Sequence, residues 1–160
     1  MVQFSDNLIQ QKIIFMRLVV QRVKESRVHV DGACIGQIEK GLLVYLGIHR
    51  NDTFASIPWM VNKLINLRIF EDAQGKMNLS LKETGGEVLV VSQFTLYGNC
   101  ANGRRPDFLE AARPAEAEAL YNQFVEEVRK ELGRVQTGQF QATMEVYSIN
   151  DGPVTFWIEK

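Results

Sequence analysis

The sequence predicts a layered α/β domain in which a curved, mainly antiparallel and barrel-like β-sheet is covered by two α-helices. Two patterns lead to this expectation. Several segments are rich in β-branched and aromatic residues, and two others carry apolar residues at helical spacing. With 160 residues the chain can bury a core without disulfide bonds. No repeat or linker divides it, so residues 16–160 are expected to form a single domain.

The first strands are expected directly after Met16. The segment MRLVVQRVKESRVHVDG, residues 16–32, alternates approximately between apolar and polar residues, and Asp31-Gly32 can form a hairpin turn. The segment GLLVYLGI, residues 41–48, is apolar almost throughout, which is typical of a strand covered on both faces. We therefore expect residues 41–48 at the centre of the sheet.

The first helix is expected to begin at Asp52 or Thr53, because either side chain can cap it. Its apolar residues recur at helical spacing: Ile57, Met60, Val61, Leu64 and Ile65. The segment NLRIFED, residues 66–72, then predicts a strand that leads into a turn at DAQGK. The segment EVLVVSQFTL, residues 87–96, predicts a second buried strand with polar groups at its end.

The second helix is the longer one. Pro114 suits a first helical turn and Gly133 can end the helix. Between them runs an apolar stripe: Ala117, Leu120, Tyr121, Phe124, Val125, Val128 and Leu132. Residues 144–149 and 154–160 predict two closing strands on either side of Gly152-Pro153. This dipeptide indicates either a turn or a piece of backbone aimed at a ligand.

Composition excludes several classes of protein. A net charge of −1 is a poor balance for holding long nucleic acid, so DNA is not expected as a partner, whereas a small RNA contact stays open. Cys34 and Cys100 form no CxxC pair, which favours a reduced, cytoplasmic setting. No apolar run approaches the roughly 20 residues that cross a membrane, and no secretory leader is evident.

Familiar catalytic motifs are absent from the sequence, including GxSxG, the P-loop, GxGxxG after a strand, and HExxH. His29 and His49 are most simply structural or exposed residues. Cys100 lies in a polar loop without a neighbouring histidine, and a cysteine hydrolase built on it is kept as a separate hypothesis. The carboxylates are dispersed, so neither a metal site nor a cofactor is expected.

Two polar segments could carry function. In SQFTL, residues 92–96, hydroxyl and amide groups come at the end of a buried strand, where layered α/β proteins often bind ligands. The alternative is that these groups only satisfy the backbone where the strand turns. In GRRP, residues 103–106, two guanidinium groups match phosphate oxygens, or they are simply solvated. From the residues alone both alternatives stay open.

Five segments occur in a fixed order: MRLVVQRV, FEDAQGKMNLSL, VVSQFTLYG, GRRPDF and NDGPVT. Together they resemble the D-aminoacyl-tRNA deacylase family, also called D-Tyr-tRNA(Tyr) deacylase. The resemblance covers Met16 to Lys160, and SQFTL and NDGPVT look like the two signature motifs of the family. Members usually begin at the position of Met16, so residues 1–15 are expected to be a dispensable N-terminal extension or an upstream start.

The resemblance implies a homodimer that hydrolyses the ester between a D-amino acid and the 3′ end of tRNA, as a proofreading step in the cytoplasm. Activity on glycyl-tRNA is implied as well. The family's Gly-Pro peptide is cis and reaches into the partner subunit's active site, which assigns that role to Gly152 and Pro153. Exchanging D for L swaps the hydrogen and the side chain at Cα, so rigid carbonyl groups placed against that hydrogen reject the L form. The alternative function is a non-catalytic RNA-end or nucleotide-binding module.

The resemblance also implies roles for single residues. In SQFTL, the backbone N–H groups near Gln93 and Phe94 and the hydroxyls of Ser92 and Thr95 are candidates for stabilising an oxyanion. Thr95 corresponds to a residue once proposed as a nucleophile, but no base is evident, so positioning is favoured and the ribose 2′-hydroxyl can help to activate water. The residues implied in substrate binding and chiral selection are Gly152, Pro153, Met144, Arg22 and Asn150.

Three of these assignments are more specific. Met144 is implied to line the pocket, and Arg22 to hold the Gly-Pro loop in orientation. Phe94 is expected to contribute to the wall around the terminal adenosine. Arg104 and Arg105 are candidate phosphate contacts outside this set.

Overall fold

A computed structural model describes residues 16–160. The expected extension of residues 1–15 lies outside the described residues. The strands are β1 (Arg17–Val30), β2 (Ala33–Ile38), β3 (Gly41–Gly47), β4 (Arg68–Glu71), β5 (Met77–Ser80), β6 (Glu87–Ser92), β7 (Gln136–Thr137) and β8 (Glu145–Glu159). The helices are η1 (Phe54–Ser56), α1 (Ile57–Asn66), α2 (Leu81–Thr84), η2 (Phe94–Tyr97) and α3 (Pro114–Leu132), of which η1 and η2 are short 3₁₀ helices.

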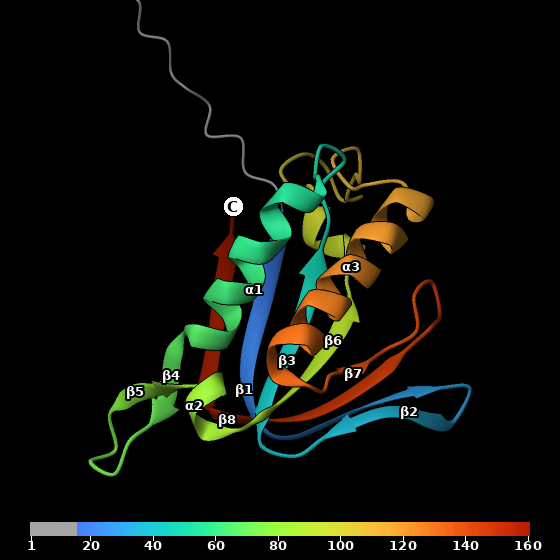
Figure 1. The fold of residues 1–160 in the computed structure, drawn as a ribbon. Helices are drawn as coiled ribbons and strands as arrows, with labels where there is room; N and C mark the ends of the chain where they lie inside the picture. Colours follow the sequence, from blue (N-terminus) through green and yellow to red (C-terminus); the bar gives the residue numbers. More distant parts are fainter. Residues whose placement is uncertain (1–15) are drawn as a thin grey trace, which may run out of the picture.

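One curved sheet of six strands organises the fold (Figure 1). Its long strand β1 pairs antiparallel with β8 on one side, and with β3 and then β2 on the other. β6 runs parallel to β3, and β7 runs parallel to β6. On this second side, β3 pairs with the first half of β1 and β2 pairs with the second half. The sheet bends between these two halves of β1 (Figure 1). This mixed, nearly closed sheet confirms the predicted fold class.

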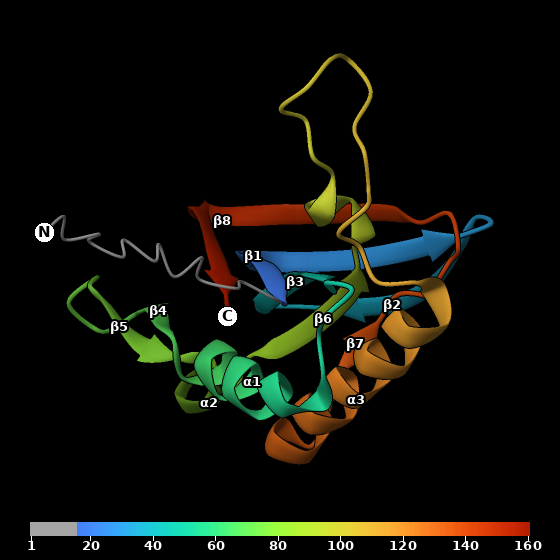
Figure 2. The ribbon, with the colours of Figure 1, turned by 90° about the horizontal axis from the view of Figure 1, so that it is seen from above.

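The main core lies between the sheet and the helices α1 and α3, which cover the same face (Figures 1 and 2). Every residue of β3 except Tyr45 is buried, as predicted for a central strand. The predicted apolar stripes of both helices face the sheet, and Phe124 of α3 is completely buried. A smaller cluster inside the bend of the sheet contains Val23, Val28, Ile38, Leu43, Leu89 and Val91.

Several boundaries differ from the predictions. The strand expected over residues 87–96 ends at Ser92, and the chain turns into η2. The two closing strands are one continuous strand, β8, with an irregularity opposite Arg22. The short helix α2 was not expected, although Ser80 and Glu83 form a capping box that the sequence contains. Within residues 16–160, no helix is both long enough and apolar enough to span a membrane.

Asp52 joins the start of β1 to the segment that follows β3. One carboxylate oxygen accepts a hydrogen bond from the Met16 N–H at 2.9 Å, and the other accepts from the His49 N–H at 2.7 Å. Burial raises the pKa of Asp52 from 3.8 to about 6, although both backbone hydrogen bonds act in the opposite direction. The folded protein therefore holds a proton on Asp52 more tightly than the unfolded chain does.

This pKa shift predicts a pH dependence of stability. Because the folded pKa lies above the unfolded value, the contribution of Asp52 is full below about pH 4 and is lost as pH rises through about 6. Relative to Asp52→Asn, we expect the unfolding free energy of the wild-type protein to fall by about 1 kcal/mol over this range, a figure reduced for partial exposure. Denaturant titrations at pH 4, 5, 6 and 7 measure it. A constant difference between the two proteins would contradict the assignment.

Candidate functional site

A cleft of about 630 Å³ lies beyond the ends of β3 and β6. Its volume is within the usual range for small-molecule sites. The lining residues are Leu46, Ile48, Val91, Ser92, Gln93, Phe94, Phe108, Ala111, Ala112, Pro114, Ala117, Phe140, Gln141, Ala142, Met144 and Val146. Most of them are apolar, and none of these side chains carries a charge. The cleft therefore suits a largely flat, uncharged group that is oriented by a few polar contacts.

The SQFTL motif runs from the last residue of β6 into η2, and it is fixed against β3. The Gln93 N–H donates to the Leu46 carbonyl at 2.8 Å, which extends the parallel pairing of β3 and β6 by one residue. Gly47 allows this close approach, since a Cβ at its position would lie 2.9 Å from the Cβ of Leu96. The position of η2 is thus set by the two central strands of the sheet.

Arg17 holds the other end of η2. Its guanidinium donates to the Leu96 carbonyl at 2.9 Å and lies 4.4 Å from the centre of the Tyr97 ring. It also lies 3.6 Å from the Glu159 carboxylate. Tyr97 is buried, and this burial raises its pKa well above the ordinary value. Sequence reasoning missed Arg17 because the residue comes from the start of β1, far from the motif along the chain.

Some polar groups in and next to η2 already have a hydrogen-bond partner, whereas others could bind a ligand. The Gln93 N–H, predicted as a candidate donor, is already bound to Leu46, so it is not available to a ligand. The Gln93 side-chain amide donates to the Thr95 hydroxyl. Among the described residues no acceptor is found for the N–H groups of Phe94 and Thr95, the first two of η2. These two N–H groups are therefore the candidate donors to a ligand in the cleft.

No side chain that usually acts as a base or nucleophile lines the cleft within residues 16–160, apart from the hydroxyl of Ser92. His49 is buried behind η2, its ring centre 5.3 Å from that of Tyr97, and burial lowers its pKa. His29 packs against Tyr147 instead. Cys100 is exposed, and its thiol contacts the Gly98 carbonyl at 3.8 Å. Cys100 is not among the residues that line the cleft.

Aromatic and sulfur-containing side chains form the walls of the cleft. Phe94, which is 58% exposed, makes an edge contact with Phe108, their ring centres 5.1 Å apart. Met144 lies on another wall beside Gly138, where a Cβ would be 2.5 Å from its sulfur atom. Phe108, Phe140 and Gly138 were not predicted as site residues. Phe108 belongs to the GRRPDF segment, but neither that segment nor the residues around Gly138 and Phe140 have a periodicity that reveals their position beside the cleft.

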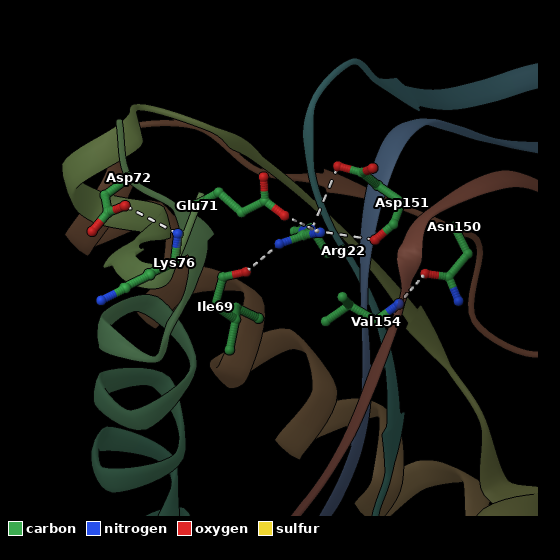
Figure 3. A network of polar contacts seen from close by, with 8 residues as sticks. All are labelled: Arg22, Ile69, Glu71, Asp72, Lys76, Asn150, Asp151 and Val154. Atoms are coloured by element: carbon green, nitrogen blue, oxygen red, sulfur yellow. Dashed lines mark hydrogen bonds and ion pairs between the residues drawn. The ribbon is translucent and has the colours of Figure 1, made fainter. Parts of the chain in front are cut away.

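A second group of predicted residues surrounds Arg22, whose side chain is 6% exposed (Figure 3). Its guanidinium donates to the Ile69 carbonyl at 2.8 Å and to the Asp151 carbonyl at 3.3 Å. The carboxylates of Asp151 and Glu71 lie 3.5 and 3.8 Å from it. Arg22 thus connects β4 with the irregular segment of β8, and both negative charges compensate its buried charge.

The irregular segment of β8 displays Gly152 and Pro153. Gln21 and Val23 of β1 pair with Thr155 and Asn150, so residues 151–154 stand opposite the single residue Arg22. The Asn150 side chain braces this bulge by accepting from the Val154 N–H at 3.0 Å (Figure 3) and donating to the Thr155 hydroxyl at 3.1 Å.

Within the bulge, Val154 is buried whereas Gly152 and Pro153 are exposed, and the peptide between these two is cis, as the resemblance implied. Gly152 has a φ of +131°, which a side chain would strain. The bulge therefore presents a braced piece of main chain at the surface.

The structure thus brings the predicted site residues together in two separate groups. Ser92, Gln93, Phe94 and Met144 line the cleft, and Thr95 adjoins them on η2. Arg22, Asn150, Gly152 and Pro153 form the other group, and none of them lines the cleft of the same chain. Arg22, beside the bulge, comes five positions after Arg17, beside η2, which corresponds to about 17 Å along an extended strand.

Two solved structures share the fold of this chain. One is described as a c-Myc DNA unwinding element binding protein, is 42% identical, and superimposes with a TM-score of 0.85 over 90% of this chain and 98% of its own. The other is described as a probable eukaryotic D-amino acid tRNA deacylase, with a TM-score of 0.81 over 91% and 99% of the two chains. At 20% identity, the second supports the fold alone.

Sequence comparison identifies the family. The family model for D-Tyr-tRNA(Tyr) deacylase matches residues 19–159. A protein of Protochlamydia amoebophila named D-aminoacyl-tRNA deacylase is 56% identical over 90% of this chain and 95% of its own length. A protein of Thermosipho melanesiensis with the same name is 54% identical over 90% and 97%. The chain belongs to the D-Tyr-tRNA(Tyr) deacylase family.

Proposed function

We propose that this protein hydrolyses the ester bond of D-aminoacyl-tRNA, releasing the free amino acid and tRNA, and that it acts in the cytoplasm as a single domain over residues 16–160. The observation that carries the proposal is the SQFTL segment, which holds two available N–H groups at an uncharged, aromatic-walled cleft. The names of relatives at 56% identity over most of the chain support it. The adenine base at the 3′ end of tRNA is the kind of flat, uncharged group that this cleft suits.

The reaction requires polarisation of the ester carbonyl and delivery of water. The N–H groups of Phe94 and Thr95 would stabilise the oxyanion that forms when water attacks the carbonyl carbon. The Thr95 hydroxyl accepts from Gln93 and has no base beside it in the cleft, which supports positioning rather than nucleophilic attack. The ribose 2′-hydroxyl beside the ester then helps to activate the water, and the departing 3′-oxygen takes the proton.

Chiral selection is assigned to Gly152 and Pro153 of the partner subunit. Both residues are exposed, braced by Arg22 and Asn150, and are not among the residues that line the cleft of their own chain. Carbonyl groups placed against the Cα hydrogen of a D-amino acid would collide with the side chain of an L-amino acid. Glycine has no side chain to reject, so glycyl-tRNA is proposed as a second substrate.

A homodimer would bring these two groups together. On the outer face of β8, Tyr147, Ile149 and Trp157 are each between 44% and 50% exposed. A two-fold axis through this face, between η2 and the bulge, would place the bulge of each subunit beside the cleft of the other. The two contacts would be equivalent, as in other isologous dimers.

The central experiment compares D-tyrosyl-tRNA and L-tyrosyl-tRNA incubated with the purified protein, with release of free amino acid followed over time. We expect rapid hydrolysis of the D-ester and little of the L-ester, because the bulge excludes the L side chain. A non-catalytic RNA-binding module would bind both without releasing amino acid. Full activity of Cys100→Ser would exclude the cysteine hydrolase.

Arg22→Lys tests the positioning of the bulge. Lysine keeps the charge but cannot donate to the carbonyls of Ile69 and Asp151 in the same fork geometry. We expect the ratio of D to L hydrolysis to fall about tenfold or more, which corresponds to about 1.4 kcal/mol of lost discrimination. Arg129→Lys, at an exposed position of α3 away from β8, is the control. An unchanged ratio in a folded Arg22→Lys protein would contradict the role of the bulge.

Ile149→Asp tests the dimer. Ile149 is 49% exposed, so the change should leave the fold of one subunit intact while placing charge in the proposed interface. We expect sedimentation to show a monomer, with loss of activity on D-tyrosyl-tRNA. Ile35→Asp, at 40% exposure on β2, is the control that should remain dimeric. A fully active monomer would exclude a site completed by the partner.

A further inference from the structure

The loop of residues 98–110 projects from the rim of the cleft, on the side opposite α1 and α3 (Figure 2). Its base is closed by two backbone hydrogen bonds between Asn99 and Asp107, of 2.8 and 3.1 Å. The edge contact of Phe108 with Phe94 attaches the loop to the wall of the cleft. The Arg50 N–H donates to the Glu110 carbonyl at 2.9 Å and fixes the returning segment. These contacts therefore fix the base of the loop, and with it the projecting part, relative to the wall of the cleft.

Arg104 and Arg105 lie in this projecting part, and both are exposed. None of the ion pairs between described residues involves either of them. The carboxylates of the loop, Asp107 and Glu110, belong to its base and to its returning segment. Negative and positive charge are thus separated within the loop, and the two arginines are available to a partner.

We propose that Arg104 and Arg105 bind the phosphates of the tRNA strand that leads to the 3′-terminal adenosine. This inference rests on the proposed function, because an adenosine in the cleft requires the preceding nucleotides to leave past its rim. Guanidinium groups bind phosphate oxygens through paired hydrogen bonds, and contacts of this kind position a nucleic acid without reading its sequence. The loop would therefore increase affinity for every tRNA alike, while the chemistry stays in the cleft.

The test compares two substrates that differ in phosphates. The double variant Arg104→Gln/Arg105→Gln should raise KM for D-tyrosyl-tRNA about tenfold without changing kcat, because the lost contacts lie outside the reacting atoms. Hydrolysis of D-tyrosyl-adenosine, which has no phosphate, should be unchanged. The dependence of log KM on log salt should become shallower by about 1.4, since each lost contact to a single strand accounts for about 0.7. Arg104→Lys/Arg105→Lys should restore most of the affinity.

A matched control removes two positive charges elsewhere. Arg129→Gln/Lys130→Gln changes an exposed pair at the end of α3, and KM for D-tyrosyl-tRNA should stay within twofold of the wild-type value. An unchanged KM in the loop variant, an equal loss in both double variants, or conversion of the loop variant to a monomer would overturn the inference. If the wild-type protein hydrolysed neither substrate, the proposed function itself would fail.

Discussion

The parallel pairing of β3 with β6 determines where a ligand can bind in this protein. Both strands are buried between helices and the bend of the sheet, so they cannot slip without exposing apolar residues. The Gln93 N–H continues this pairing by one residue and then the chain turns, and within residues 16–160 the next two N–H groups, those of Phe94 and Thr95, have no acceptor. The position of the candidate donors, the N–H groups of Phe94 and Thr95, is therefore determined by where the pairing of β3 and β6 ends.

A second, independent arrangement holds the surface bulge of β8. Arg22 is almost fully buried, yet its fork reaches carbonyl groups from two different segments of the chain. A buried guanidinium without these partners would be costly, so the arrangement is maintained as a unit. Among the described residues, no hydrogen bond or ion pair joins the bulge to a residue that lines the cleft, and this separation is the main support for a site shared by two subunits.

Much of the fold was predictable from local pattern. The stripe from Ala117 to Val128 and the apolar run of β3 predicted burial correctly, because periodicity reports which face of an element is covered. The end of β6 was not predictable, since residues 93–96 have the composition of a strand, yet the pairing with β3 stops at Gln93 and η2 begins at Phe94. The motifs identified Ser92 and Gly152 as candidate site residues. Arg17, Phe108 and Gly138 were not identified, because they contact residues that are distant along the chain and come together only in the folded protein.

Arg22 also connects the bulge of β8 to the antiparallel hairpin formed by β4 and β5. One of its two carbonyl partners, that of Ile69, belongs to β4, so a displacement of this hairpin would be transmitted through a single side chain to Asp151 and its neighbours. The turn between β4 and β5 is on the surface and far along the chain from Gly152. A substitution in this turn could therefore change the position of the bulge through Arg22, while Gly152 and Pro153 themselves stay the same.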